Sequence, residues 1–81
     1  MSLPDALIMH GIAEVARTHL GLKFELSPDM RLVEDLDLDS LKSLTLALEV
    51  ENRFRICLDE DAGIVTVGDL VNIVRERLDA G

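Results

Sequence analysis

The chain has 81 residues, of which 48% are hydrophobic and only 2% aromatic, and its formal net charge is −8. A chain of this length forms one domain, over residues 1–81, and buries only about 60% of the surface that it exposes when unfolded. The acidic balance excludes nucleic acid as a partner, because phosphates require a basic face, and it favours protein partners with basic docking patches. No apolar run reaches the roughly 18 residues of a membrane-spanning helix, so we expect no membrane span.

The first predicted helix begins near Pro4, a residue that is tolerated in the first turn of a helix. Apolar residues then recur at three- and four-residue spacing, which indicates one buried face. Gly21 is a typical stop signal. The face consists of Ile8, Ile12, Val15 and either His19 or Leu20.

Residues 22–39 carry Pro28 and six acidic side chains, and they predict a long structured loop. A loop of this length in a small domain usually has a functional reason. The expected anchors of the loop on the core are its apolar residues, Phe24, Leu26, Met30, Leu32, Val33 and Leu36.

The second predicted helix, from about Ser40 to Arg53, has two apolar arcs instead of one. A helix in so small a protein can hardly bury both arcs, and an exposed apolar patch commonly marks a partner site. Burial of both arcs by a central helix is the alternative. One arc comprises Leu46, Ala47, Val50 and Phe54, and the other comprises Leu41, Leu44 and Leu48.

The remaining chain predicts a short helical element around residues 59–63 and a last helix that starts at Thr66. Asp69 follows Thr66 at the spacing of a capping box. The fold class is therefore all-α: a small antiparallel four-helix bundle, with three main helices, one short helix and a long loop between helices 1 and 2. The single cysteine, Cys57, excludes an internal disulfide, fits the reducing cytoplasm and is expected to be buried.

Ser40 stands alone between the acidic loop and the second helix, where it suits covalent modification better than catalysis. A serine is a weak nucleophile without a general base in reach, and His10 and His19 belong to another helical segment. We therefore expect no catalytic residue and no enzyme activity. The alternating Asp35, Asp37 and Asp39 imitate a calcium loop, but its glycine and bidentate glutamate are missing, so we expect no metal site.

Four segments of the sequence resemble the acyl carrier protein family, over about Ile8 to Val74. The resemblance implies that Ser40 carries 4'-phosphopantetheine, transferred from coenzyme A by a magnesium-dependent phosphopantetheinyl transferase, and that Asp39 helps to place the metal in that complex. It implies a carrier that presents acyl thioesters to acyl-loading and acyl-processing enzymes of fatty-acid, specialised lipid or polyketide synthesis. Because the N-terminus shows no signal-peptide pattern, we expect a cytoplasmic protein, and we expect a monomer. The matching segments are Val33-Glu34-Asp35-Leu36, Leu38-Asp39-Ser40-Leu41, Ala47-Leu48-Glu49 and Phe54.

Family members dock through the exposed side of the second helix and shelter the acyl chain between the second and third helices. The docking positions carried over to this chain are Leu41, Lys42, Leu44, Leu48 and Glu51. Lys42 stands where an acid is frequent, and Asp37-Leu38 replaces a common Gly-Ala. These departures favour a specialised member over a housekeeping one. An aminoacyl or peptidyl carrier protein, or a helical interaction domain that is never modified, stays an open alternative.

Overall fold

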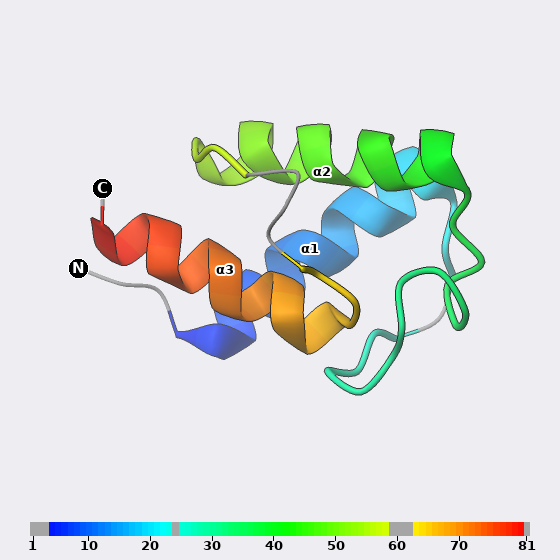
Figure 1. Ribbon diagram of the computed structural model, residues 1–81, viewed down its shortest axis with the longest axis horizontal. Helices are drawn as coiled ribbons and strands as arrows, with labels where there is room; N and C mark the ends of the chain where they lie inside the picture. The colour runs from blue at the N-terminus through cyan, green and yellow to red at the C-terminus, as the bar shows by residue number, and fades with distance from the viewer. Residues whose placement is uncertain (1–3, 24, 59–62, 81) are drawn as a thin grey trace.

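The computed structural model describes residues 4–23, 25–58 and 63–80 of the chain, and in these residues the only regular secondary structure is helical. Three helices follow one another: α1 (Asp5–Leu20), α2 (Ser40–Phe54) and α3 (Val67–Ala80). α2 and α3 both run broadly opposite to α1 (Figure 1). The predicted all-α class is confirmed, and so are the three main helices. The fourth, short helix was predicted at residues that lie almost entirely outside the described ranges, so it stays a prediction.

The ends of α1 lie within one residue of those expected from the sequence. Pro4 is the N-cap residue, one position before the helix, and its carbonyl accepts hydrogen bonds from the N–H groups of Leu7 and Ile8 at 3.0 and 3.2 Å. Gly21 adopts the left-handed conformation, φ 70°, that ends a helix, and its N–H donates to the carbonyl of Ala16.

α3 begins with the predicted capping box. Thr66 Oγ1 accepts from the N–H of Asp69 at 3.1 Å, and Asp69 Oδ2 accepts from the N–H groups of Thr66 at 3.1 Å and Val65 at 3.0 Å. These bonds, led by the one from Thr66, hold the pKa of Asp69 below its usual value because they stabilise the carboxylate.

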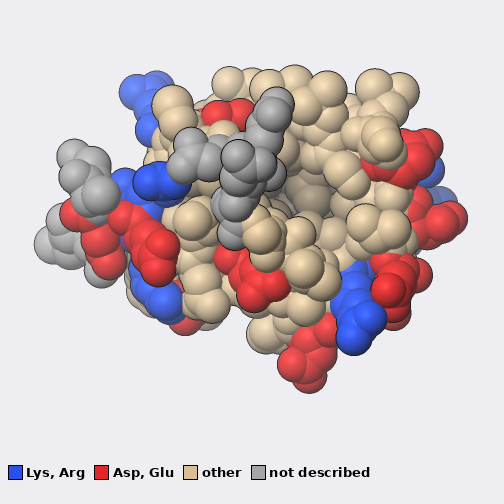
Figure 2. All heavy atoms as spheres, in the orientation of Figure 1, with Lys and Arg blue, Asp and Glu red and all other residues tan. Residues whose placement is uncertain are grey.

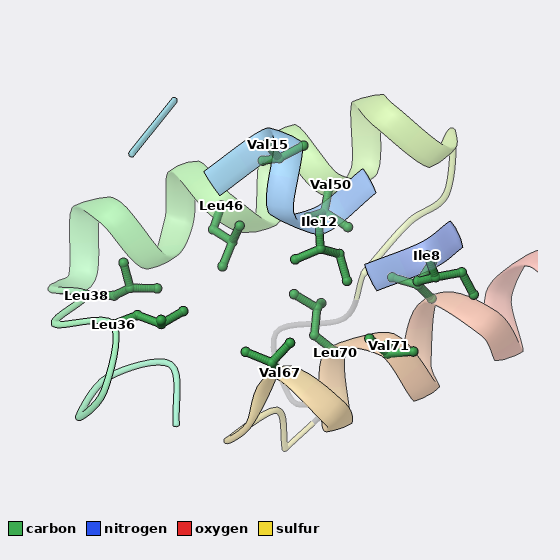
Figure 3. Packing of buried hydrophobic residues seen from close by; sticks show 11 residues of the cluster. Ile8, Ile12, Val15, Leu36, Leu38, Leu46, Val50, Val67, Leu70 and Val71 are labelled. Carbon is green, nitrogen blue, oxygen red and sulfur yellow. The ribbon is translucent and has the colours of Figure 1, made fainter. Parts of the chain in front are cut away.

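α1 is the helix on which the other two pack, whereas α2 and α3 make few direct contacts with each other. All three helices contribute to one aliphatic core (Figure 3). Its fully buried members include Ile8 and Ile12 of α1, Val50 of α2, and Val67 and Val74 of α3. Because α1 carries both partners, the core does not require α2 and α3 to close on each other.

The described residues between α1 and α2 pass beside the start of α3, where a short antiparallel pairing joins them. The N–H of Leu32 donates to the carbonyl of Val65 at 2.9 Å, and that of Val67 donates to the carbonyl of Met30 at 2.8 Å. Leu36 is buried, as predicted.

Two expectations for apolar residues outside the helices are wrong, and one buried residue was missed. Val33 is 64% exposed, although it was expected to anchor the loop, and Cys57 is exposed, although it was expected to be buried. Leu38 is buried, although it was not among the expected anchors. Val33 lies in a turn that is closed by hydrogen bonds from the N–H groups of Asp35 and Leu36 to the carbonyl of Arg31. Cys57 lies in the irregular segment that follows α2. Among the described residues, no helix has both the length and the apolar character to cross a membrane.

Candidate attachment site and docking surface

Ser40 is the first residue of α2, and it is exposed. Asp39 is the N-cap residue: its Oδ1 accepts from the N–H of Lys42 and its carbonyl accepts from the N–H of Ser43, both at 2.8 Å. Within the described part of the chain, the N–H groups of Ser40 and Leu41 have no acceptor. The start of α2 therefore keeps two free donors at the positive end of the helix dipole, which is a favourable place for an anion.

Two buried leucines anchor the segment that precedes Ser40 on the core. Leu36 and Leu38 are buried next to each other near the start of α2 (Figure 3). Asp37, between them, has a left-handed backbone, φ 54°, which costs energy for a residue other than glycine. The two leucines hold the segment on the core, while the acidic side chains Asp37 and Asp39 lie on the surface.

No histidine is placed to activate Ser40. His10 Nε2 lies 2.9 Å from Glu14 Oε1 within α1, and His19 Nε2 lies 3.0 Å from Glu49 Oε2 across the contact between α1 and α2. His10 therefore has its carboxylate partner within α1, and His19 has its partner on α2.

The three leucines of the second predicted arc lie on the surface. Leu41 is 72%, Leu44 55% and Leu48 49% exposed, whereas Leu46 and Val50 of the first arc are buried. The prediction of two arcs with one exposed is confirmed, and the alternative that both are buried is wrong. Lys42 is exposed on the first turn of α2.

A cavity of about 350 Å³ opens beside this surface, between α2, the loop before it and the start of α3. Figure 2 shows the hollow in a face where uncharged atoms predominate along α2, with acidic side chains at the end at which α2 begins and also at the opposite end of the molecule. Leu44 and Leu48 belong both to the exposed arc and to the cavity wall. The wall is almost entirely aliphatic: Leu32, Val33, Leu44, Leu46, Ala47, Leu48, Leu58, Ile64 and Leu70, with Ser43 and Glu51 as its polar members.

Glu51 was predicted as a docking residue, and in the structure it also makes a hydrogen bond at the cavity wall that the sequence did not indicate. Its side chain is half-buried at the cavity wall, and Oε2 accepts from the N–H of Leu58 at 3.0 Å. The bond joins a residue of α2 to one that lies seven positions further on, beyond the helix. No sequence pattern indicates such a bond, so only the structure reveals it.

Comparison with known proteins identifies the family. No protein-family model matches the chain. The meromycolate extension acyl carrier protein of Mycobacterium leprae is 35% identical over 79 residues, which cover 94% of this chain and 69% of that protein. The protein of the same name from Mycolicibacterium aurum is 36% identical over 79 residues, 94% of this chain and 81% of its own. The acyl carrier protein of Beutenbergia cavernae is 32% identical over 77 residues, 91% of this chain and 94% of its own.

At these identities over nearly the whole chain, the chain belongs to the acyl carrier protein family. Members of this family are carriers and not enzymes, and they normally bear a phosphopantetheine group. The predicted family and the predicted absence of an enzyme function are confirmed by these relatives.

Proposed function

We propose that Ser40 is the residue to which a 4'-phosphopantetheine arm is attached, and that the chain holds acyl groups on this arm as thioesters. The observation that carries the proposal is the position of Ser40: an exposed serine on the first turn of α2, in a chain of the acyl carrier protein family. When attached, the group would supply the terminal thiol on which the acyl group is held as a thioester.

The residues around Ser40 fit a phosphodiester. The free N–H groups of Ser40 and Leu41 lie at the N-terminal, positive end of α2, where a negative charge is stabilised. Asp39 uses Oδ1 to cap the helix, and its other carboxylate oxygen has no partner among the described residues. That oxygen is available to help place magnesium in the complex with a phosphopantetheinyl transferase, which is the role that we propose for Asp39.

We propose that partner enzymes dock on Leu41, Leu44 and Leu48, with acidic residues around the start of α2 steering them through their basic patches. Weak, fast association of this kind suits a monomeric carrier that visits several enzymes in turn. The acyl-loading and acyl-processing enzymes would thus meet the surface that adjoins the cavity.

Lys42 is the residue by which we expect this surface to select its partners. It places an exposed positive charge on the first turn of α2, and none of the described acidic side chains pairs with it. A basic patch that suits an acid at this position would repel Lys42. Lys42→Glu should therefore increase acyl-transfer rates with a housekeeping fatty-acid synthase, and the increase should shrink as salt screens the charge. Equal rates at low and high salt would contradict this role.

We propose further that the cargo is an aliphatic acyl chain of a specialised lipid pathway. The names of several relatives refer to meromycolate extension, and the cavity of about 350 Å³ is lined by aliphatic side chains. A cavity of about 150 Å³ accepts a six-carbon ring, so the space in this chain suits roughly a dozen carbon atoms. A cytoplasmic location stays a prediction.

The decisive experiment is to incubate the protein with coenzyme A and a broad-range phosphopantetheinyl transferase and to measure its intact mass. Wild type should gain one arm, Ser40→Ala should gain none, and the matched control Ser43→Ala should gain one. Ser40→Ala should melt at nearly the wild-type temperature, because Ser40 is exposed. An arm located on Ser43, or no arm on wild type with several transferases, would refute the proposal.

The aminoacyl or peptidyl carrier alternative differs in where its cargo lies. An aliphatic cargo that enters the cavity should stabilise the holo protein by about 0.8 kcal/mol for each buried methylene group until the cavity is full. Melting temperatures that are identical for short and longer acyl chains would show that the cargo stays in solvent, which would favour the alternative.

A further inference from the structure

Glu51 fixes the chain that leaves α2, and it does so with both its backbone and its side chain. The carbonyl of Glu51 accepts hydrogen bonds from the N–H groups of Arg55 and Ile56, the latter at 3.1 Å. Its carboxylate accepts from the N–H of Leu58 at 3.0 Å. The first two bonds close the end of the helix, whereas the third reaches beyond it and determines where the chain runs next.

The third bond lies at the cavity. Glu51 and Leu58 both line the cavity, so the bond holds one part of its wall against α2. Arg55, three residues before Leu58, is in the left-handed conformation at φ 55°. Residues 56–58 have no regular secondary structure. Among the hydrogen bonds of residues 56–58 in the described structure, the carboxylate of Glu51 provides the only one made by a side chain.

The part of the wall formed by Leu32 and Leu70 is held differently. Leu32 is joined to Val65 by a backbone hydrogen bond of 2.9 Å, and the neighbouring Met30 accepts from the N–H of Val67 at 2.8 Å. This pairing continues into α3, whose residues Val67 and Leu70 are buried in the core. One wall is thus part of the core, whereas the other depends on a side chain that can be replaced.

We propose that the hydrogen bond from the Leu58 amide to the Glu51 carboxylate limits the length of the aliphatic chain that the cavity accepts, which makes Glu51 a residue that determines cargo specificity. This inference rests on the proposed carrier function. Loss of the bond lets residues 56–58 move away from α2 while α1 still holds α2 and α3. The cavity then accepts longer chains. A role of Glu51 in docking alone would depend on its charge and would leave the cavity unchanged.

Three variants separate these roles. Glu51→Ala removes the acceptor, whereas Glu51→Gln removes the charge but keeps an oxygen that accepts from Leu58. Glu49→Ala is the matched control, because Glu49 pairs with His19 on the other side of α2 and does not line the cavity. Glu51→Gln also guards against the case in which Glu51→Ala does not fold.

The first measurement is amide hydrogen exchange at Leu58 in the protein without an arm. Exchange should be about tenfold faster in Glu51→Ala, since a hydrogen bond to a charged group is lost, and it should be close to wild type in Glu51→Gln and Glu49→Ala. The second is titration of the same proteins with straight-chain alcohols of increasing length. Affinity should rise roughly fourfold for each methylene group that enters the cavity and then level off. The length at which it levels off should be greater in Glu51→Ala alone.

A common length limit in all four proteins would overturn the inference, and so would a shift in Glu51→Gln as large as that in Glu51→Ala. Neither measurement needs the arm, so both give an answer even if the transferase experiment refutes the proposed function. If the arm is attached to Ser40 and the alcohols show one common limit, the carrier function stands and only the role of Glu51 fails.

Discussion

The two sides of α2 differ in how they are closed. Towards α1, the ring of Phe54 packs against Gly11. The ion pair of Glu14 with Arg53 and the contact of His19 Nε2 with Glu49 Oε2 also span this side. Towards α3, the same helix makes few direct contacts, and a cavity of about 350 Å³ lies there instead.

This difference explains how a domain of 81 residues keeps a stable core beside an adaptable cavity. The free energy of unfolding of such a domain is only about 4 to 12 kcal/mol. A cavity within the contact between α1 and α2 would lower it further. Here the stabilising contact and the open side lie on opposite faces of one helix. The attachment site proposed at Ser40 stands at the end of that helix, next to the open side.

The largest expected effect comes from shortening leucines on the two arcs of α2. Leu46→Ala should lower the free energy of unfolding by about 2 to 5 kcal/mol, because Leu46 is buried and its loss leaves a void. Leu44→Ala should change it by about 0.5 kcal/mol or less, because Leu44 is 55% exposed. Chemical denaturation of both variants measures the difference. Equal losses would show that the exposed arc is part of the core.

A smaller loss should follow from a methyl group placed in the contact between α1 and α2. In Gly11→Ala the new Cβ would lie 2.6 Å from Cζ of Phe54, so the ring must move. Overpacking of this kind costs about 1 to 3 kcal/mol, and the better helix propensity of alanine offsets up to about 1 kcal/mol. A net loss of about 1 kcal/mol is therefore expected.

Phe54→Leu in the Gly11→Ala background provides the control, because the shorter side chain no longer reaches the methyl group. The loss caused by Gly11→Ala should then disappear, which thermal unfolding of the four proteins in the cycle would detect. A loss that persists without the ring would place its cause within α1.

The sequence was a good guide to features that depend on neighbouring residues. The ends of the three helices follow from local residues such as Gly21 and the pair of Thr66 and Asp69, and the two arcs of α2 follow from helical periodicity. Ser40 could be chosen from the sequence for the same reason, because its position at the start of a helix is a local property.

Features that depend on how distant segments meet could not be predicted. The exposure of Val33 and the burial of Leu38 depend on how the loop between α1 and α2 lies on the core and pairs with the start of α3, which the composition of the loop does not specify. The bond from Leu58 to Glu51 and the fit of Phe54 over Gly11 likewise arise only in the folded chain. The cavity could be expected from the family, but its walls could not.

Acid should loosen the cavity side of the molecule before the contact between α1 and α2. Asp69 has a lowered pKa because it accepts the N–H groups of Thr66 and Val65. The stability that it contributes is fully present above the unfolded value, about 3.9, and is lost as the pH falls through the lower folded value. Amide exchange at Val65 and Thr66 should therefore increase in this range relative to exchange in α1.

Asp69→Asn is the control for the acid effect, because its amide does not titrate. Its exchange at Val65 and Thr66 should be faster than in wild type at neutral pH and should change less on acidification. Equal pH dependence in both proteins would assign the loosening to other carboxylates.

The smallest expected effect concerns the ion pair on the closed side of α2. Arg53 Nη2 lies 2.9 Å from Glu14 Oε2, but both side chains are nearly half exposed, so water and salt screen their attraction. A double-mutant cycle with Glu14→Ala and Arg53→Ala should give a coupling energy of only about 0.2 to 1 kcal/mol. His10 also contacts Glu14, so the cycle should be repeated in His10→Ala to remove the shared partner. A small coupling in both backgrounds would mean that packing, through residues such as Phe54 and Val50, closes this side of α2. A coupling above the cost of Leu46→Ala would reverse that order and make the charged pair the main link between α1 and α2.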